Sequence, residues 1–433
     1  MWDRVQEPWV NEDTIKGLNS SNYNLVYALN KADITVVKVE QKEKPFFLVS
    51  TYLAHDEGIP PVPLTRLVEE NRKEDVLIGC DANARHTVWG SSSINTRDFA
   101  AAISAFPVEE GRENGENGWY VPQVDGSFVW MTIEEGENAI AEREKQDTLE
   151  GRLNLVPVNY YLYTQKNPTT PQKITVTAET ILNSNFNASN PTKFLIHGWL
   201  QSYKADMNKN IRDAWLSNGD YNIIVVDWAR ARLIDYISSV VAVPKVGKKI
   251  ADMIECLVEN HGLSLSDTEV IGHSLGAQAA GFTGKNIASG KLHAIVGLDP
   301  ALPLYSYNKP NKRLNSDDAT YVESIQTDGG QLGFLKPIGK GAFYPNGGKK
   351  QPGCGLDLTG ACSHARSCIY YAEAVKADNF PSMRCGDYQE AVSKSCGVSY
   401  SSVKMGAVTN AYMVAGDFYV PVRSAAPYGY GSD

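Results

Sequence analysis

Several features are missing from this sequence, and each absence narrows what the protein can be. No stretch of the 433 residues approaches the 18 apolar residues that a membrane-spanning helix requires, so we expect no transmembrane segment. The net charge of −9 argues against a nucleic-acid partner, because such proteins usually carry a basic balance or a basic patch. Internal repeats are also absent. The remaining composition, 42% hydrophobic and 21% charged, is that of an ordinary globular protein.

Cysteine is scarce in the first part of the chain, where only Cys80 occurs before residue 250. No CxxC pattern occurs, which weakens a zinc interpretation. Two close pairs favour short-range disulfides formed in an oxidising compartment, with free thiols as the alternative. These pairs are Cys354 with Cys362 and Cys385 with Cys396. Cys256 and Cys368 lie on predicted helices among apolar neighbours, where we expect buried free cysteines.

The N-terminus lacks the pattern of an export signal, since the residues after Met1 offer neither a basic segment nor an apolar one. A sequence typical of the end of such a signal occurs instead at residues 99–105, FAAAISA, where a short apolar run ends in a small residue. We interpret this segment as the remnant of a signal peptide whose front half has been replaced. The protein that starts at Phe106 is then expected to be secreted.

Residues 1–98 form a part of their own, with apolar strands predicted at 46–53 and 75–83 and helical spacing between them. This part resembles a truncated α+β fragment of the endonuclease of non-LTR retrotransposons, which belongs to the endonuclease/exonuclease/phosphatase family. The resemblance rests on Gly79, Asp81, Asn83, His86, Trp89, Gly90, Asn95 and Arg97. It assigns metal-assisted phosphodiester cleavage to Asp81 and Asn83. The Asp-His pair that the family also needs occurs nowhere in the chain, so we interpret both residues as vestigial and expect no metal site.

The rest of the chain, from residue 106 onward, divides into an extension and a main domain. Residues 106–150 form an N-terminal extension with a predicted helix, and residues 151–433 form the main domain. In this domain short apolar, β-branched segments alternate with segments of helical periodicity, which predicts an α/β fold with a mainly parallel sheet. Strands are expected at 192–199, 221–228, 268–273 and 293–299, and helices at 206–216, 246–262 and 274–287.

A GxSxG pentapeptide, GHSLG, occupies residues 272–276. It lies between a predicted strand and a predicted helix of small residues, which is the setting of a nucleophile elbow. This sharp turn needs glycines and exposes the Ser274 hydroxyl at the edge of the sheet. The helix that starts beside it favours negative charge that develops during a reaction. The pattern therefore predicts Ser274 as a catalytic nucleophile.

A serine hydroxyl needs a base to remove its proton, and in α/β-hydrolases the order along the chain is serine, acid, histidine. Asp299 directly follows the strand predicted at 293–299, and His364 is the only histidine after it. Order and position therefore predict the triad Ser274, Asp299 and His364. The Leu275 amide and the Trp199 amide, each just after a strand end, are the expected oxyanion donors.

Six segments together resemble the pancreatic lipase family, especially its insect members related to phospholipases A1. These segments are FLIHGW, VVDW, GHSLGA, GLDPA, RLNSDDA and CSHARS. The resemblance implies an α/β-hydrolase fold and assigns nucleophile, acid and base to the same three residues. It also places carboxylate ligands of a calcium loop at Asn315 and Asp318. Because Asn315 is an amide, the calcium site is weakened, and we expect no cofactor.

The segment before His364 bears on the substrate. In the family a disulfide-closed lid lies there, and here Cys354 and Cys362 enclose only GLDLTGA. So small a loop has little apolar area for docking on oil, and Lys349 and Lys350 lie near the expected cleft mouth. We therefore expect a serine carboxylester hydrolase of the phospholipase A1 type, which acts on phospholipid or glyceride at a membrane or micelle surface. The alternatives are a triacylglycerol lipase and a non-catalytic lipid carrier similar to yolk proteins.

Overall fold

The computed structural model describes residues 111–150, 156–233, 235–407, 410 and 414–431, together with the backbone of six strands between residues 10 and 81. The chain divides into two compact units. One comprises Met1–Pro107 with Asp125–Ser127, and the other comprises Val108–Val124 with Phe128–Asp433. Within the described ranges, no helix is both long and apolar enough to cross a membrane.

The first unit contains a four-stranded sheet in the order β3-β4-β5-β6, of which only the last two strands, β5 and β6, are parallel. The strands of this unit are β1 Val10–Asn11, β2 Thr14–Ile15, β3 Asn24–Lys31, β4 Ile34–Glu40, β5 Phe46–Tyr52 and β6 Asp75–Asp81. The strands predicted at 46–53 and 75–83 are thus confirmed, and Asp81 ends β6. The helix expected between them, Asn83 and the signal-peptide remnant lie outside the described residues.

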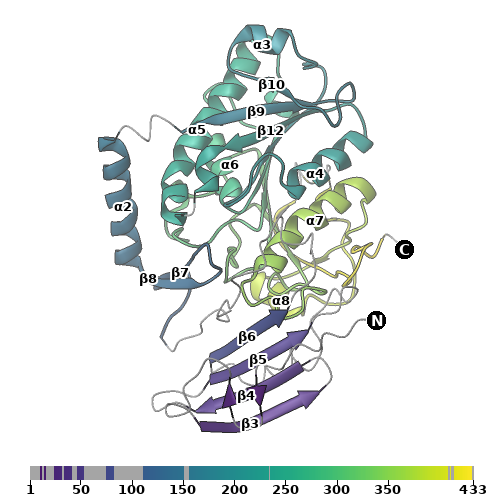
Figure 1. Cartoon of the computed structure of the whole chain (residues 1–433). Helices are drawn as coiled ribbons and strands as arrows, with labels where there is room; N and C mark the ends of the chain where they lie inside the picture. Colours follow the sequence, from purple (N-terminus) through teal and green to yellow (C-terminus); the bar gives the residue numbers. More distant parts are fainter. Residues whose placement is uncertain are drawn as a thin grey trace, which may run out of the picture. The chain divides into compact units, whose positions relative to one another are not determined.

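The second unit contains a ten-stranded sheet whose central part is parallel (Figure 1). The order is β10-β9-β12-β11-β13-β14-β15-β16-β18-β17, and every neighbouring pair from β12 to β18 is parallel. Antiparallel strands β10, β9 and β17 extend the edges. The bounds are β9 Val158–Tyr163, β10 Gln172–Ile174, β11 Thr192–Ile196, β12 Asn222–Trp228, β13 Thr268–His273, β14 Ala294–Leu298, β15 Tyr321–Ile325, β16 Gly341–Pro345, β17 Met383–Arg384 and β18 Gly416–Val420. The predicted parallel sheet is confirmed.

Helices cover both faces of this sheet, because successive strand residues point to opposite sides. α5 and α6 pack on strand side chains that include Phe194 and Val270. α4 and α7 pack on the alternate set, which includes Leu195 and Ile271 (Figure 1). The remaining elements of the second unit are the hairpin β7 Gly118–Pro122 and β8 Phe128–Thr132, and the helices α2 Ile133–Leu149, α3 Ala178–Leu182, α4 Asp206–Ser217, α5 Tyr236–His261, α6 Leu275–Asn286, α7 Ala361–Ala377 and α8 Tyr388–Ser393.

The helix predicted at 246–262 is correct at its end and wrong at its start. α5 begins at Tyr236, where the Asp235 carboxylate accepts a hydrogen bond from the Ile237 amide at 3.1 Å. The helix then continues through Pro244. Proline usually ends a helix because it lacks an N–H group. Here Val243 before it and Val246 after it are buried, while Pro244 itself is exposed, and the packing of the buried face outweighs the local preference.

The cysteines differ from expectation at one position. Two disulfides, Cys354–Cys362 and Cys385–Cys396, are present. Cys368 on α7 is buried and free, as predicted. Cys256 is free but half-exposed, so the prediction of burial is wrong there. Its thiol donates to the Val176 carbonyl at 3.3 Å, and its side chain packs at the margin of the hydrophobic core.

Candidate active site

Ser274 lies in a strained turn between β13 and α6. Its backbone has φ 56° and ψ −122°, which non-glycine residues rarely adopt. The turn leaves no room for side chains around it, since a Cβ on Gly276 would lie 2.2 Å from the carbonyl oxygen of Ile196. Ser274 is only 8% exposed. The strand-turn-helix expected from the pentapeptide is therefore what the chain forms.

Asp299 follows β14 on the neighbouring strand of the sheet, and its carboxylate is fully buried. One oxygen, Oδ2, lies 2.5 Å from Nδ1 of His364. The other oxygen, Oδ1, accepts from the backbone amides of Thr327 at 2.7 Å and Asp328 at 3.0 Å. These bonds fix the carboxylate and stabilise its negative charge. Asp299 can therefore orient the imidazole of His364.

His364 lies in the first turn of α7 and is 9% exposed. The carboxylate of Asp357 accepts from the amides of Cys362 and Ser363 at 2.9 and 2.7 Å, which caps the start of this helix. The disulfide from Cys354 ends on Cys362, two residues before His364. The small loop and the first turn of α7 are thus one connected structure.

His273, which the sequence analysis left without a role, links the serine and the histidine. Its ring lies 4.5 Å from the ring of His364, centre to centre, and its Nε2 is 3.3 Å from the His364 carbonyl oxygen. Because Ser274 follows His273 directly, this contact joins the end of β13 that leads into the serine to the first turn of α7. Burial, and secondarily the nearby His364, holds the pKa of His273 well below its usual range. A neutral His273 adds no competing charge beside His364.

The two amides expected as oxyanion donors belong to segments that border Ser274. Leu275 is the first residue of α6, where helix N–H groups have no intrahelical partner. Gly198 packs directly on the serine, since a Cβ on it would lie 2.9 Å from the Ser274 Cβ. The next residue is Trp199, whose indole donates to the Leu233 carbonyl at 2.8 Å. This bond fixes the segment that carries the Trp199 amide.

Two further buried side chains adjoin the site. Asp328 lies shortly after the end of β15 at Ile325, and Asp299 lies directly after the end of β14; the imidazole of His364 bonds to Asp299. Burial, with Asp299 and Asp357 adding to it, raises the pKa of Asp328 well above its usual range. Gln278 on α6 donates to the Ala301 carbonyl at 2.7 Å and accepts from the Leu314 amide at 2.8 Å. Gln278 therefore ties the helix behind Ser274 to the loop that follows Asp299.

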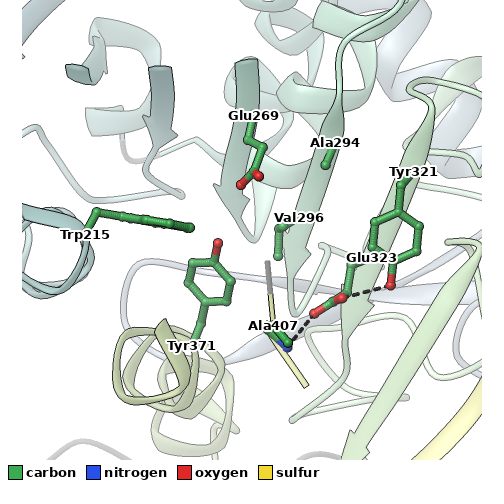
Figure 2. A pocket seen from close by; sticks show the side chains of 9 residues that line it. Trp215, Glu269, Ala294, Val296, Tyr321, Glu323, Tyr371 and Ala407 are labelled. Carbon is green, nitrogen blue, oxygen red and sulfur yellow. Dashed lines mark hydrogen bonds between the residues drawn. The ribbon is translucent and has the colours of Figure 1, made fainter. Parts of the chain in front are cut away.

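A second polar cluster lies near the starts of the central strands β13, β14 and β15, whereas Ser274 follows the end of β13 (Figure 2). It lines a cavity of about 20 Å³, enough for one water molecule. Its centre is the buried carboxylate of Glu323, which accepts from the Tyr321 hydroxyl at 2.8 Å, the Gly406 amide at 2.9 Å and the Asn410 side chain at 3.1 Å. Burial raises the pKa of Glu323 to about 7. Sequence reasoning gave no sign of this cluster.

The fold and this site define a class of protein. A mainly parallel sheet covered by helices on both faces, with a serine in a strand-turn-helix and a histidine bonded to a buried aspartate, is the arrangement of the α/β-hydrolases. The sequence profile of the family described as Lipase matches residues 128–428, and the chain belongs to that family. The protein is accordingly a carboxylic ester hydrolase.

Characterised relatives include both phospholipases and triacylglycerol lipases. The chain is 36% identical to the probable phospholipase A1 magnifin of Vespa magnifica over 265 residues, which cover 57% of this chain and 77% of the relative. It is 34% identical to phospholipase A1 of Vespula vulgaris, covering 55% and 74%. It is 33% identical to pancreatic triacylglycerol lipase of Sus scrofa, covering 56% and 58%. The family match starts at residue 128 and gives no support to the endonuclease fragment at 1–98, which stays a prediction.

Proposed function

We propose that the protein releases the sn-1 acyl chain of phospholipids, with Ser274, Asp299 and His364 as its catalytic triad. The bond of 2.5 Å between His364 Nδ1 and Asp299 Oδ2, beside a serine in a nucleophile elbow, is the observation that carries this assignment. A histidine held in this way keeps its proton on Nδ1 and presents Nε2 to the serine hydroxyl.

The reaction follows from this arrangement. Ser274 Oγ attacks the ester carbonyl while His364 Nε2 takes its proton, and Asp299 stabilises the imidazolium that forms. The amides of Leu275 and Trp199 bind the oxyanion of the tetrahedral intermediate. His364 then protonates the departing lysophospholipid alkoxide, which leaves an acyl-enzyme. Water, activated by His364, attacks this ester and releases the fatty acid, and the proton returns to Ser274.

The preference for phospholipid rests on the loop between Cys354 and Cys362. Of its two leucines, Leu356 is itself buried, so the loop presents little apolar surface with which to cover the cleft or bind oil. Lys349 and Lys350, just before the loop, are exposed and can meet lipid phosphates. The wasp relatives that carry the name phospholipase A1 support the same substrate.

The second candidate is a triacylglycerol lipase, which the 33% identity to the porcine pancreatic enzyme favours. The two are separated by comparing initial rates on phosphatidylcholine vesicles and on emulsified triolein. We expect the vesicles to be hydrolysed faster, with release of the sn-1 chain. Much faster hydrolysis of triolein assigns the protein to the triacylglycerol lipases instead.

A non-catalytic lipid carrier is tested with a serine-reactive phosphonate and the variant Ser274→Ala. We expect the phosphonate to label the wild type at Ser274, and the variant to lose at least ~10⁴-fold in turnover while it stays folded. Ser399→Ala, at an exposed serine, is the matched control and should keep full activity. Lipid binding without labelling contradicts the triad.

We further propose that the protein acts outside the cell, since two disulfides suit an oxidising compartment. Mass spectrometry of the protein recovered from culture medium tests this proposal. We expect both cysteine pairs to be oxidised. Retention in the cell with reduced thiols contradicts the proposal.

A further inference from the structure

The segment that connects Asp299 to the start of β15 runs alongside α6. At the far end of α6 from Ser274 it packs so closely that a Cβ on Gly284 would lie 2.0 Å from the Asp318 carbonyl oxygen. One residue further along the helix, Lys285 reaches over the same segment. Because α6 starts directly after Ser274 and the segment starts at Asp299, this contact joins the elements that follow the nucleophile and the acid.

Lys285 makes all its polar contacts with this segment. Its ammonium group lies 2.5 and 2.6 Å from the two carboxylate oxygens of Asp318, and 2.8 Å from the carbonyl oxygen of Arg313. The Asn315 amide donates to Asp318 Oδ2 at 2.8 Å and closes the turn. The Lys285 and Asp318 side chains are only 20% and 5% exposed. One positive charge is thus surrounded by three oxygen atoms.

These residues do not fit the calcium ion that the family resemblance places at Asn315 and Asp318. Calcium requires six to eight oxygen ligands. Here both oxygens of Asp318 already bind an ammonium group, and Asn315 supplies no negative charge. A divalent cation bound to Asp318 would lie against the charge of Lys285, and the two would repel each other.

We propose that the ammonium group of Lys285 takes the place of a metal ion in this segment and holds the segment to α6. Lys285 is then a positioning residue, which holds the segment between Asp299 and β15 against α6. Burial lowers the pKa of Lys285 and raises the pKa of Asp318, and the bond between the two acts against both shifts. Each side chain therefore depends on the other to be buried in its charged form.

The test is thermal unfolding of the full chain, which does not depend on the proposed substrate. We expect the midpoint of the wild type to be the same in EDTA and in millimolar CaCl2. Lys285→Met, which keeps the length and removes the charge, should lower the midpoint by about 5–10 °C. Lys248→Met removes an exposed lysine paired with Asp252 and should leave the midpoint unchanged.

A wild-type midpoint that rises with calcium or falls in EDTA overturns the proposal. The same holds for Lys285→Met if it unfolds at the wild-type temperature. If this variant yields no folded protein, the calcium titration of the wild type still decides, and terbium luminescence supplies a direct binding measurement. Saturable terbium binding that Asp318→Asn abolishes would show that the segment holds a metal after all.

Discussion

Replacing Glu323 by glutamine should change how the stability of the protein depends on pH. The Glu323 carboxylate is buried beside the small cavity near the starts of β13, β14 and β15 (Figure 2). Three donors bond to it, from Tyr321, Gly406 and Asn410. Burial outweighs these donors and raises its pKa from an ordinary 4.5 to about 7. Glutamine has nearly the same shape, keeps one acceptor and cannot ionise.

The sign of the effect follows from the direction of the shift. Between pH 4.5 and 7 the folded protein holds a proton on Glu323 that the unfolded chain has released. The free energy of unfolding therefore falls as the pH rises through this window and is constant above it, as far as this group is concerned. A shift of this size corresponds to on the order of 3 kcal/mol.

Urea denaturation of the wild type and of Glu323→Gln, from pH 4.5 to 8, measures this effect. The difference between the two free energies of unfolding should shift by about 3 kcal/mol in favour of the variant as the pH rises, because the variant lacks the titrating group. Glu144→Gln, at an exposed residue of α2, is the matched control and should parallel the wild type. Parallel curves for Glu323→Gln would refute the reasoning.

Two further predictions concern the active site. Asp299→Asn should lower kcat by roughly 10³–10⁴-fold with little change in KM, because the amide favours the wrong tautomer of His364. Steady-state kinetics on a soluble ester measure this, and a loss below tenfold contradicts the role of Asp299. Gly276→Ala should destabilise the protein by about 1–3 kcal/mol and reduce activity, because the new methyl group meets the Ile196 carbonyl. Thermal unfolding measures the loss of stability, and an unchanged midpoint would contradict the close contact between residue 276 and Ile196.

Much of the central sheet could be predicted because its signals are local. β11 to β14 are short buried segments bounded by turn residues, and the central residues of each are apolar, as is usual for buried parallel strands. The turn at Ser274 could likewise be predicted from five consecutive residues, 272–276. The start of α5 could not be predicted, because Pro244 is unfavourable locally and only packing against the sheet outweighs it.

The features that sequence reasoning missed depend on contacts between distant parts of the chain. Lys285 and Asp318 lie 33 residues apart, and Glu323 and Asn410 lie 87 apart. Nothing in the local sequence of either pair indicates its partner. Asp299 carried a readable signal because it directly follows β14, whereas Asp328 lies two residues further from the end of its strand. The structure also separates the two, since His364 bonds to Asp299.

The loop closed by Cys354 and Cys362 has a consequence for the position of His364. It is fastened to α7 by the disulfide and by the Asp357 carboxylate, and its Leu356 is buried. Because Cys362 lies in the first turn of α7, a movement of this loop would pull on the turn that also contains His364. The loop and the imidazole therefore cannot change position independently, and any rearrangement of the loop would also disturb the bond between His364 and Asp299.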